Sequence, residues 1–225
     1  MIVSVHIADV GAARAPRVLR SRPDAAGTPG LHYAETMIAA PLGGRLLPRA
    51  QLGRVGMVAA WKDDDALERF LATHSLAERL RGGWHARLEP LRASGAWSRL
   101  QGLPTQELAV DDAEPVAVLT LGRMRLRRVL PFLRASARAE RQAVADPALL
   151  AATGLARPAQ LVATFSLWRT ASAMREYAYG ADGEGHSSAI GAHRAEPFHH
   201  ESVFIRFRPY AWSGSWDGRD PLAVS

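Results

Sequence analysis

Two segments of the chain carry the same pattern of residues 107 positions apart. Each one, Val55–Phe70 and Val162–Tyr177, is an apolar run that ends in tryptophan, followed by a polar turn and a segment of helical period. The later parts of the two halves also match, because Gly95-Ala-Trp97 corresponds to Gly214-Ser-Trp216. A repeat of this length is too long for a solenoid. It predicts a duplicated domain.

Each half reads strand-helix-strand-strand-helix-strand. In the first half we predict strands at Ile2–Val10, Leu31–Ala40, Arg54–Trp61 and near His85–Leu91, and helices at Ala12–Ser21 and Asp64–Leu80. In the second half we predict strands at Val116–Gly122, Leu149–Leu155, Leu161–Trp168 and Ser202–Arg208, and helices at Arg127–Glu140, Ala171–Tyr179 and His186–Ala195. The alternation of the last strand predicts that Val203, Ile205 and Phe207 point inward, and the repeated Trp61 and Trp168 are interpreted as core residues. The pattern favours an α+β fold of tandem ferredoxin-like repeats, like a dimeric α/β barrel within one chain. The expected units are 1–104, a linker at 105–115, and 116–225.

Composition excludes several classes of protein and site. The 225 residues include no cysteine, which excludes disulfides, a thiol nucleophile, cysteine-bound zinc, iron–sulfur clusters and thiolate-bound haem. The net charge of +6 invites a nucleic-acid partner, but 27 of the 28 basic residues are scattered arginines. We expect no nucleic-acid partner, although an acidic protein or anionic lipid remains an alternative. No apolar stretch reaches about 18 residues and the N-terminus reads as a strand, so we expect a cytoplasmic protein without a transmembrane segment.

Histidine is the chemically informative residue in a chain without a Walker loop, a Rossmann fingerprint or a nucleophile elbow. On a helix, His186 and His193 share one face with Ala189 and Ile190, which would suit a flat apolar macrocycle with one axial imidazole. The alternative is that His186 caps the helix and His193 packs in the core. The pair His199-His200, after the break at Pro197, is either exposed loop or aimed into a cavity.

A basic set, Arg123-Met-Arg125-Leu-Arg127-Arg128, lies where a strand turns into a helix. Guanidinium groups at this position would bind carboxylates such as haem propionates. A solvated strand end explains the same residues equally well.

The C-terminal third resembles the spheroidene monooxygenase family. The resemblance rests on Val162–Trp168, on Gly185–Glu196, on Glu201–Phe207, and on the closing Gly214-Ser-Trp216-Asp-Gly218. Weaker similarity extends back through Arg125-Leu-Arg127-Arg128 and Ala60-Trp61. It covers most of residues 30–222 and implies a haem-containing monooxygenase that takes its electrons from a partner such as a ferredoxin-type reductant.

The resemblance implies haem b in the C-terminal half, with His186 as the axial ligand of the iron. It further implies Ile190, Arg127 and Phe165 at the cofactor. For the catalytic groups the sequence offers three candidates: His193, His199 and Arg125. The polar His193 and His199-His200 depart from the family pattern, which favours a small or terpenoid intermediate over a carotenoid. Two other functions stay open, a haem enzyme acting on a nitrogen function without O₂ and a haem-free ligand-binding module, as does the oligomeric state.

Overall fold

The computed structural model describes residues 1–43, 51–157, 160–180 and 198–223. The first half contains β1 (Ile2–Asp9), α1 (Ala15–Arg20), β2 (Leu31–Pro41), β3 (Arg54–Trp61), α2 (Asp64–Thr73), α3 (Ser75–Leu80) and β4 (Trp84–Ala96). The second half contains β5 (Val116–Met124), a 3₁₀ turn (Leu126–Arg128), α4 (Val129–Ala145), β6 (Leu149–Arg157), β7 (Leu161–Trp168), α5 (Ala171–Tyr179) and β8 (His199–Gly214). The predicted helix His186–Ala195 lies outside the described residues.

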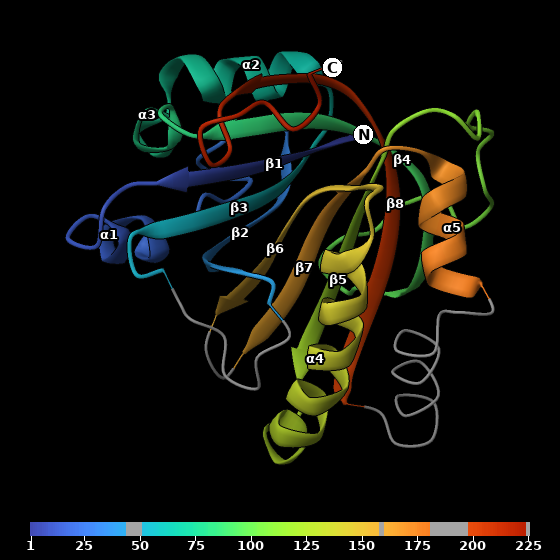
Figure 1. Ribbon diagram of the computed structural model, residues 1–225. Helices are drawn as coiled ribbons and strands as arrows, with labels where there is room; N and C mark the ends of the chain where they lie inside the picture. The colour runs from blue at the N-terminus through green and yellow to red at the C-terminus, as the bar shows by residue number, and fades with distance from the viewer. Residues whose placement is uncertain (44–50, 158–159, 181–197, 224–225) are drawn as a thin grey trace.

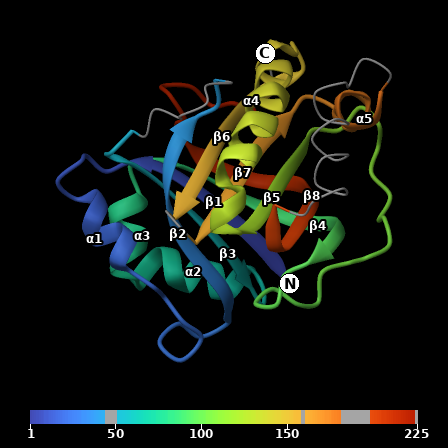
Figure 2. The same cartoon turned by 90° about the horizontal axis from the view of Figure 1, so that it is seen from below.

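The eight strands close into one antiparallel barrel (Figure 1) in the order β1-β3-β2-β6-β7-β5-β8-β4. Within the first half the order is β4-β1-β3-β2, and within the second it is β8-β5-β7-β6, so the halves meet at the β2–β6 and β4–β8 seams. Helices α1, α2 and α3 lie on one side of the barrel and α4 and α5 on the other (Figure 2). The predicted α+β class is confirmed. No helix in the described ranges is long and apolar enough to cross a membrane.

Every second side chain along a strand points into the barrel, and such side chains from both halves fill its interior. On β8, Val203, Ile205 and Phe207 point inward as predicted, and they pack in one cluster with side chains such as Val5 of β1 and Leu119 of β5. Because this cluster draws on both halves, the barrel has a shared core. Trp61 and Trp168 are buried outside it, each against the helices of its own half, as their predicted core role requires.

Register and capping match between the halves. Leu31 faces Trp61 and Leu149 faces Trp168, and a bulge follows each of these leucines. The helix after each tryptophan is capped in the same way: the Asp63 side chain accepts from the Ala66 N–H, and the Thr170 side chain accepts from the Ala173 N–H. These contacts fix which positions of the two halves correspond.

Three elements differ from the sequence-based expectation. The segment predicted as one helix over Asp64–Leu80 is two helices, because Nδ1 of His74 accepts the Leu76 N–H and starts a new helix there. Strands β4 and β8 are longer than predicted because each pairs with the other from Trp84–Gly214 to Ala96–Ser202. Only a tertiary pairing of this kind extends strands through polar sequence.

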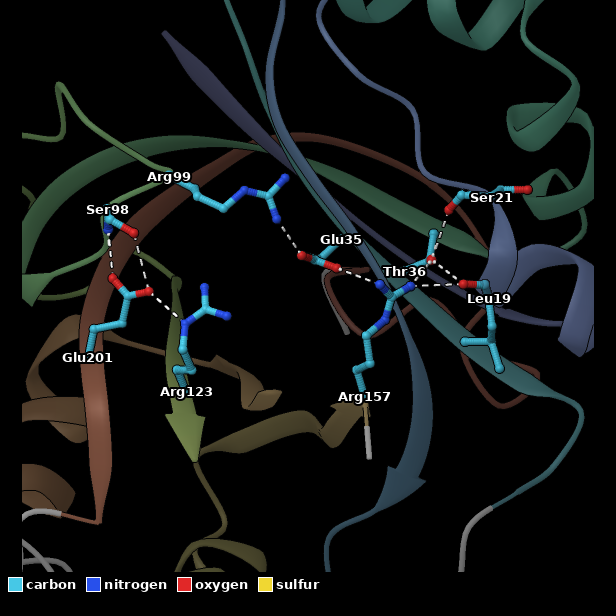
Figure 3. A network of polar contacts seen from close by, with 9 residues as sticks. All are labelled: Leu19, Ser21, Glu35, Thr36, Ser98, Arg99, Arg123, Arg157 and Glu201. Atoms are coloured by element: carbon cyan, nitrogen blue, oxygen red, sulfur yellow. Dashed lines mark hydrogen bonds and ion pairs between the residues drawn. The ribbon is translucent and has the colours of Figure 1, made fainter. Parts of the chain in front are cut away.

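A charged network surrounds one end of the barrel (Figure 3). Glu35 of β2 pairs with Arg99 at 2.8 Å and with Arg157 of β6 at 3.4 Å, so it ties the β2–β6 seam. Across the opening, Glu201 of β8 pairs with Arg123 of β5 at 2.8 Å. Burial alone would raise the pKa of Glu201, but hydrogen bonds from Ser98 and Arg123 outweigh it and the pKa is lowered. The Glu35–Arg157 pair and the hydrogen bonds from Ser98 to Glu201 join the two halves.

Candidate functional site

The outer face of the second half is the surface of its sheet that points away from the barrel core. It is floored by small side chains on neighbouring strands, with one phenylalanine: Val118, Thr120 and Gly122 of β5, Val162, Thr164 and Ser166 of β7, and Phe204 of β8. Thr120, Thr164, Ser166 and Phe204 are only partly buried. Helix α5 packs against Val118 and Phe204, but the small and hydroxyl-bearing side chains Thr120, Thr164 and Ser166 stay partly exposed, and a floor of this kind can receive a ligand.

The matching face of the first half is closed. Met57 and Ala59 of β3 stand at the positions of Thr164 and Ser166, and neither is exposed to solvent. They pack in a cluster with Leu67 and Phe70 of α2 and with α3. The two outer faces therefore differ in the size of their side chains and in how far helices cover them, although the strands beneath them have the same order and direction.

A buried histidine fills the first face at the position that Thr120 takes in the second. His6 is 3% exposed, stacks on His85 with ring centroids 5.2 Å apart and hydrogen-bonds Ser4 Oγ at 3.1 Å. Burial, and to a lesser extent the neighbouring His85, lowers the pKa of His6 to about 3. The neutral imidazole is therefore a core group of the first half.

His199 is brought onto the outer face of the second half by a bulge. Glu201 pairs with Arg123, and the next pair is His199 with Met124, so His200 is the extra residue. The bulge reverses the alternation that would have turned His199 inward with Glu201. A Cβ on Gly122 would lie 2.5 Å from Cδ2 and Nε2 of the His199 ring, so the imidazole occupies the space that this glycine leaves.

Helix α4 covers this imidazole. The ring of Phe132 meets His199 edge-on at 5.2 Å between centroids, and Phe198 contacts both rings. Helices α4 and α5 are joined where the Tyr177 hydroxyl donates to the Ala139 carbonyl at 3.0 Å. Burial, with smaller effects of Glu140 and Asp146, raises the pKa of Tyr177 to about 12. His199 thus lies between the sheet and α4.

Of the predicted arginines, Arg125 contacts His199. Arg125 is exposed and donates from Nε to the His199 carbonyl at 3.1 Å, while its backbone N–H donates to Phe198. Arg127 is exposed in the 3₁₀ turn. Arg123, in contrast, faces the barrel end and pairs with Glu201. The basic set is therefore divided between two sides of the sheet.

The other predicted site residues lie elsewhere. Phe165 is fully buried inside the barrel, where its ring stacks on Trp216 and contacts Trp84, so it lies on the opposite side of the sheet from His199. His186, Ile190 and His193 fall outside the described residues. The structure therefore brings together His199 and Arg125, and separates them from Phe165.

One residue of this face has no counterpart among the predicted site residues. Arg206 of β8 is 4% exposed, and its only ion pair in the described part of the chain is with Glu107 at 2.8 Å. It stands next to Val118 in the β5–β8 ladder. A buried arginine on a strand looks like any outward-facing polar residue in the sequence. Comparison of the two repeats, position by position, would have identified it.

Comparison with known proteins places the chain in a family. It is 31% identical over 179 residues to the spheroidene monooxygenase of Rhodobacter capsulatus, covering 76% of this chain and 73% of that protein. It is 27% identical over 213 residues to the spheroidene monooxygenase of Cereibacter sphaeroides, covering 86% of this chain and 62% of that protein. The match thus spans less than two thirds of the second relative. No family model matches the chain.

Two solved structures share the fold. An aldoxime dehydratase in complex with butyraldoxime superposes with a TM-score of 0.53 and 9% identity, covering 93% of this chain and 79% of that one. A second aldoxime dehydratase structure gives a TM-score of 0.50 and 12% identity, covering 92% and 80%. These likenesses concern the fold alone. The identity and coverage of the sequence relatives confirm the predicted resemblance, and the chain belongs to the spheroidene monooxygenase family, a family of oxidoreductase enzymes.

Proposed function

We propose that the protein is a haem-dependent monooxygenase that oxidises a small or terpenoid biosynthetic intermediate on the outer face of its second half. Family membership supports the reaction class. The observation that carries the location is the contrast between the two outer faces, since one is sealed by Met57 and His6 and the other keeps partly exposed Thr164 and Thr120 at the same positions. His199 lies on the same face, under α4 beside the partly exposed floor.

The described residues of this face suit a flat cofactor with acidic side arms. Thr120 and Thr164 present little bulk, Phe204 offers apolar contact, and His199 offers an imidazole beside them, under α4. Haem b, when bound, supplies an iron that activates O₂ for insertion of one oxygen atom into the substrate. Electrons for that step would come from a ferredoxin-type reductant. The fit supports the second half as the site of the cofactor.

The roles of the side chains follow from their positions and from the sequence. His186 is proposed as the residue that would bind the haem iron, with Ile190 as a further cofactor contact and His193 as a catalytic candidate, on the strength of their spacing in the sequence and the family resemblance. His199, held between Gly122 and α4, is proposed to hold or deliver a proton at Nε2 or Nδ1. Arg125 and Arg127 are proposed to bind anionic groups at the edge of the face. Phe165 supports the sheet from its inner side.

We further propose that the two halves, 1–104 and 116–225 with a linker at 105–115, are repeats of one ferredoxin-like unit. The repeated sequence around Trp61 and Trp168 supports this, and so do the matching bulges and caps. In this interpretation one copy keeps a sealed helical face and the other has become the ligand site. This interpretation explains why His6 is buried in the first half whereas Thr120, at the matching position of the second half, stays partly exposed.

The test is an absorption titration of the purified protein with hemin. We expect a Soret band that His186→Ala abolishes or shifts, that His199→Ala leaves in place, and that the exposed His32→Ala leaves unchanged. Substrate oxidation would then be followed with a ferredoxin, its reductase and ¹⁸O₂, with one labelled oxygen expected in the product. Absence of a Soret band from the wild-type protein at saturating hemin would refute the haem proposal and favour a haem-free binding module. Turnover without O₂ uptake would refute the monooxygenase reaction.

A further inference from the structure

Arg206 is a buried cation with unused hydrogen-bond donors. Only its Nη2 has an ion-pair partner, Glu107 Oε1 at 2.8 Å. The Nε and Nη1 atoms are buried, and within the described part of the chain neither has a hydrogen-bond partner. Burying guanidinium N–H groups without acceptors opposes folding, so such groups are retained where something supplies the acceptor.

The first half contains an arginine at the corresponding position. Arg87 pairs with Ser4, which pairs with Ala59 two residues before Trp61. Arg206 in the same way pairs with Val118, which pairs with Ser166 two residues before Trp168. The two arginines therefore occupy matching places in the two ladders, on the outer face of the sheet.

Arg87 forms ion pairs with two carboxylates of the helix that packs over it. Its Nη1 pairs with Asp64 at 2.9 Å and its Nη2 with Glu68, both on α2. These two acids raise the pKa of Arg87 against the lowering effect of burial. In the first half the protein itself provides both acceptors.

Helix α5 lacks these carboxylates. The positions of Asp64 and Glu68 are taken in α5 by Ala171 and Arg175. Arg175 pairs instead with Asp112 of the connecting segment. Because α5 has Arg175 where α2 has Glu68, it offers no carboxylate there that could accept hydrogen bonds from Arg206.

The nearby acids of the sheet and connecting segment do not replace them. Glu107, the single partner of Arg206, is shared with Arg92 at 3.4 Å. Glu89, on the neighbouring strand, is paired with Arg208. Within the described residues, the Nε and Nη1 atoms of Arg206 therefore keep their donors unused, beside Val118 at the edge of this face.

We propose that Arg206 is an anion-binding residue of the outer face of the second half, and that one of its unused donor atoms, Nε or Nη1, binds a carboxylate of the molecule that occupies this face. The inference rests on the proposed function for the location of that molecule. A carboxylate oxygen accepts a short, charge-assisted hydrogen bond from a guanidinium N–H, and each of the two unused atoms of Arg206 has such a donor. The carboxylate belongs either to a haem propionate or to a second, acidic ligand.

The experiment compares hemin with hemin dimethyl ester, in which both carboxylates are blocked. If Arg206 binds a propionate, Arg206→Gln should weaken hemin binding about 10- to 100-fold and leave binding of the ester unchanged. Arg175→Glu should have a similar effect, because it restores the carboxylate that α2 carries at Glu68. The matched control, Arg87→Gln, should not change the ratio of the two affinities.

Thermal stabilisation by benzoate tests the second source. Stabilisation that is lost in Arg206→Gln and Arg175→Glu, with hemin binding unchanged, would support a carboxylate on a ligand other than haem. The same loss in a protein that binds no hemin would support Arg206 and refute the haem proposal. Two results together would overturn the inference. The first is that Arg206→Gln and Arg175→Glu bind hemin and its ester with the same affinities as the wild-type protein. The second is that stabilisation by benzoate does not depend on Arg206.

Discussion

Trp97 and Trp216 close the barrel from opposite ends, each two residues after a glycine of left-handed conformation. Gly95 has φ +92° and Gly214 has φ +90°, and both tryptophans pack into the shared core at 4% exposure. The ends are opposite because Gly214 pairs with Trp84 at the start of β4, whereas Trp97 follows its last residue. The correspondence predicted from Gly95-Ala-Trp97 and Gly214-Ser-Trp216 thus has a structural basis: each long strand ends by turning a tryptophan into the core.

These two glycines are predicted to be irreplaceable for steric reasons. A Cβ at Gly95 would overlap the Ser202 carbonyl oxygen, and one at Gly214 would overlap that of Gly83. Gly95→Ala and Gly214→Ala should each lower the free energy of unfolding by about 2–4 kcal/mol, since overlap with backbone adds to the strain of positive φ. Gly102→Ala is the matched control, because Gly102 has φ +81° and nothing within 4 Å of its Cβ position. Equal losses at Gly95 and Gly102 in urea denaturation would contradict the steric explanation.

The pKa of His6 predicts how stability depends on pH. The folded-state value of about 3 lies below the unfolded value of 6.5, so between these values the unfolded chain binds the additional proton. The contribution of His6 to the free energy of unfolding should therefore be fully present above pH 6.5. It should fall as the pH is lowered, by up to about 1.4 kcal/mol per pH unit. His6→Gln should flatten the curve between pH 6 and 4. The exposed His32→Gln serves as control, and a wild-type slope that survives His6→Gln would exclude His6 as its source.

The contact between Gly122 and His199 predicts a strong coupling energy. A methyl group at position 122 would collide with the imidazole, so Gly122→Ala should cost about 1–3 kcal/mol of stability. In the His199→Ala background the collision is absent and the same substitution should cost much less. A double-mutant cycle in urea measures this difference. Additive losses would mean that the ring does not occupy the space beside Gly122.

Much of the fold could be predicted from the sequence, because the repeat and the apolar periodicity are local. The bounds of β3, β7 and α5 match the expected ranges, and Val203, Ile205 and Phe207 point inward as predicted. The break at His74 and the length of β4 were not predictable, since a side-chain cap and the partner strand β8 determine them.

Prediction of the site was less complete for a physical reason. Periodicity assigns a face to each strand residue, but one bulge at His200 reverses the face of His199, and no local pattern announces it. Phe165 lies in a family motif for reasons of packing, as its contacts with Trp84 and Trp216 indicate. Arg206 becomes conspicuous only once Arg87 and its two acids are known.

The shared core predicts that the barrel unfolds as one unit although the chain reads as two halves. Asp63 and Thr170 lie in different halves, and each caps the N-terminus of a helix. Asp63→Ala and Thr170→Ala should therefore each lower the free energy of unfolding by about 1 kcal/mol. If the halves are coupled through the common cluster of side chains such as Val5 and Leu119, each substitution lowers the midpoint of a single transition, and the double variant shows the sum. Urea denaturation followed by tryptophan fluorescence and by far-ultraviolet circular dichroism provides the two probes. Two separate transitions, each moved by only one of the substitutions, would show that the units 1–104 and 116–225 fold independently.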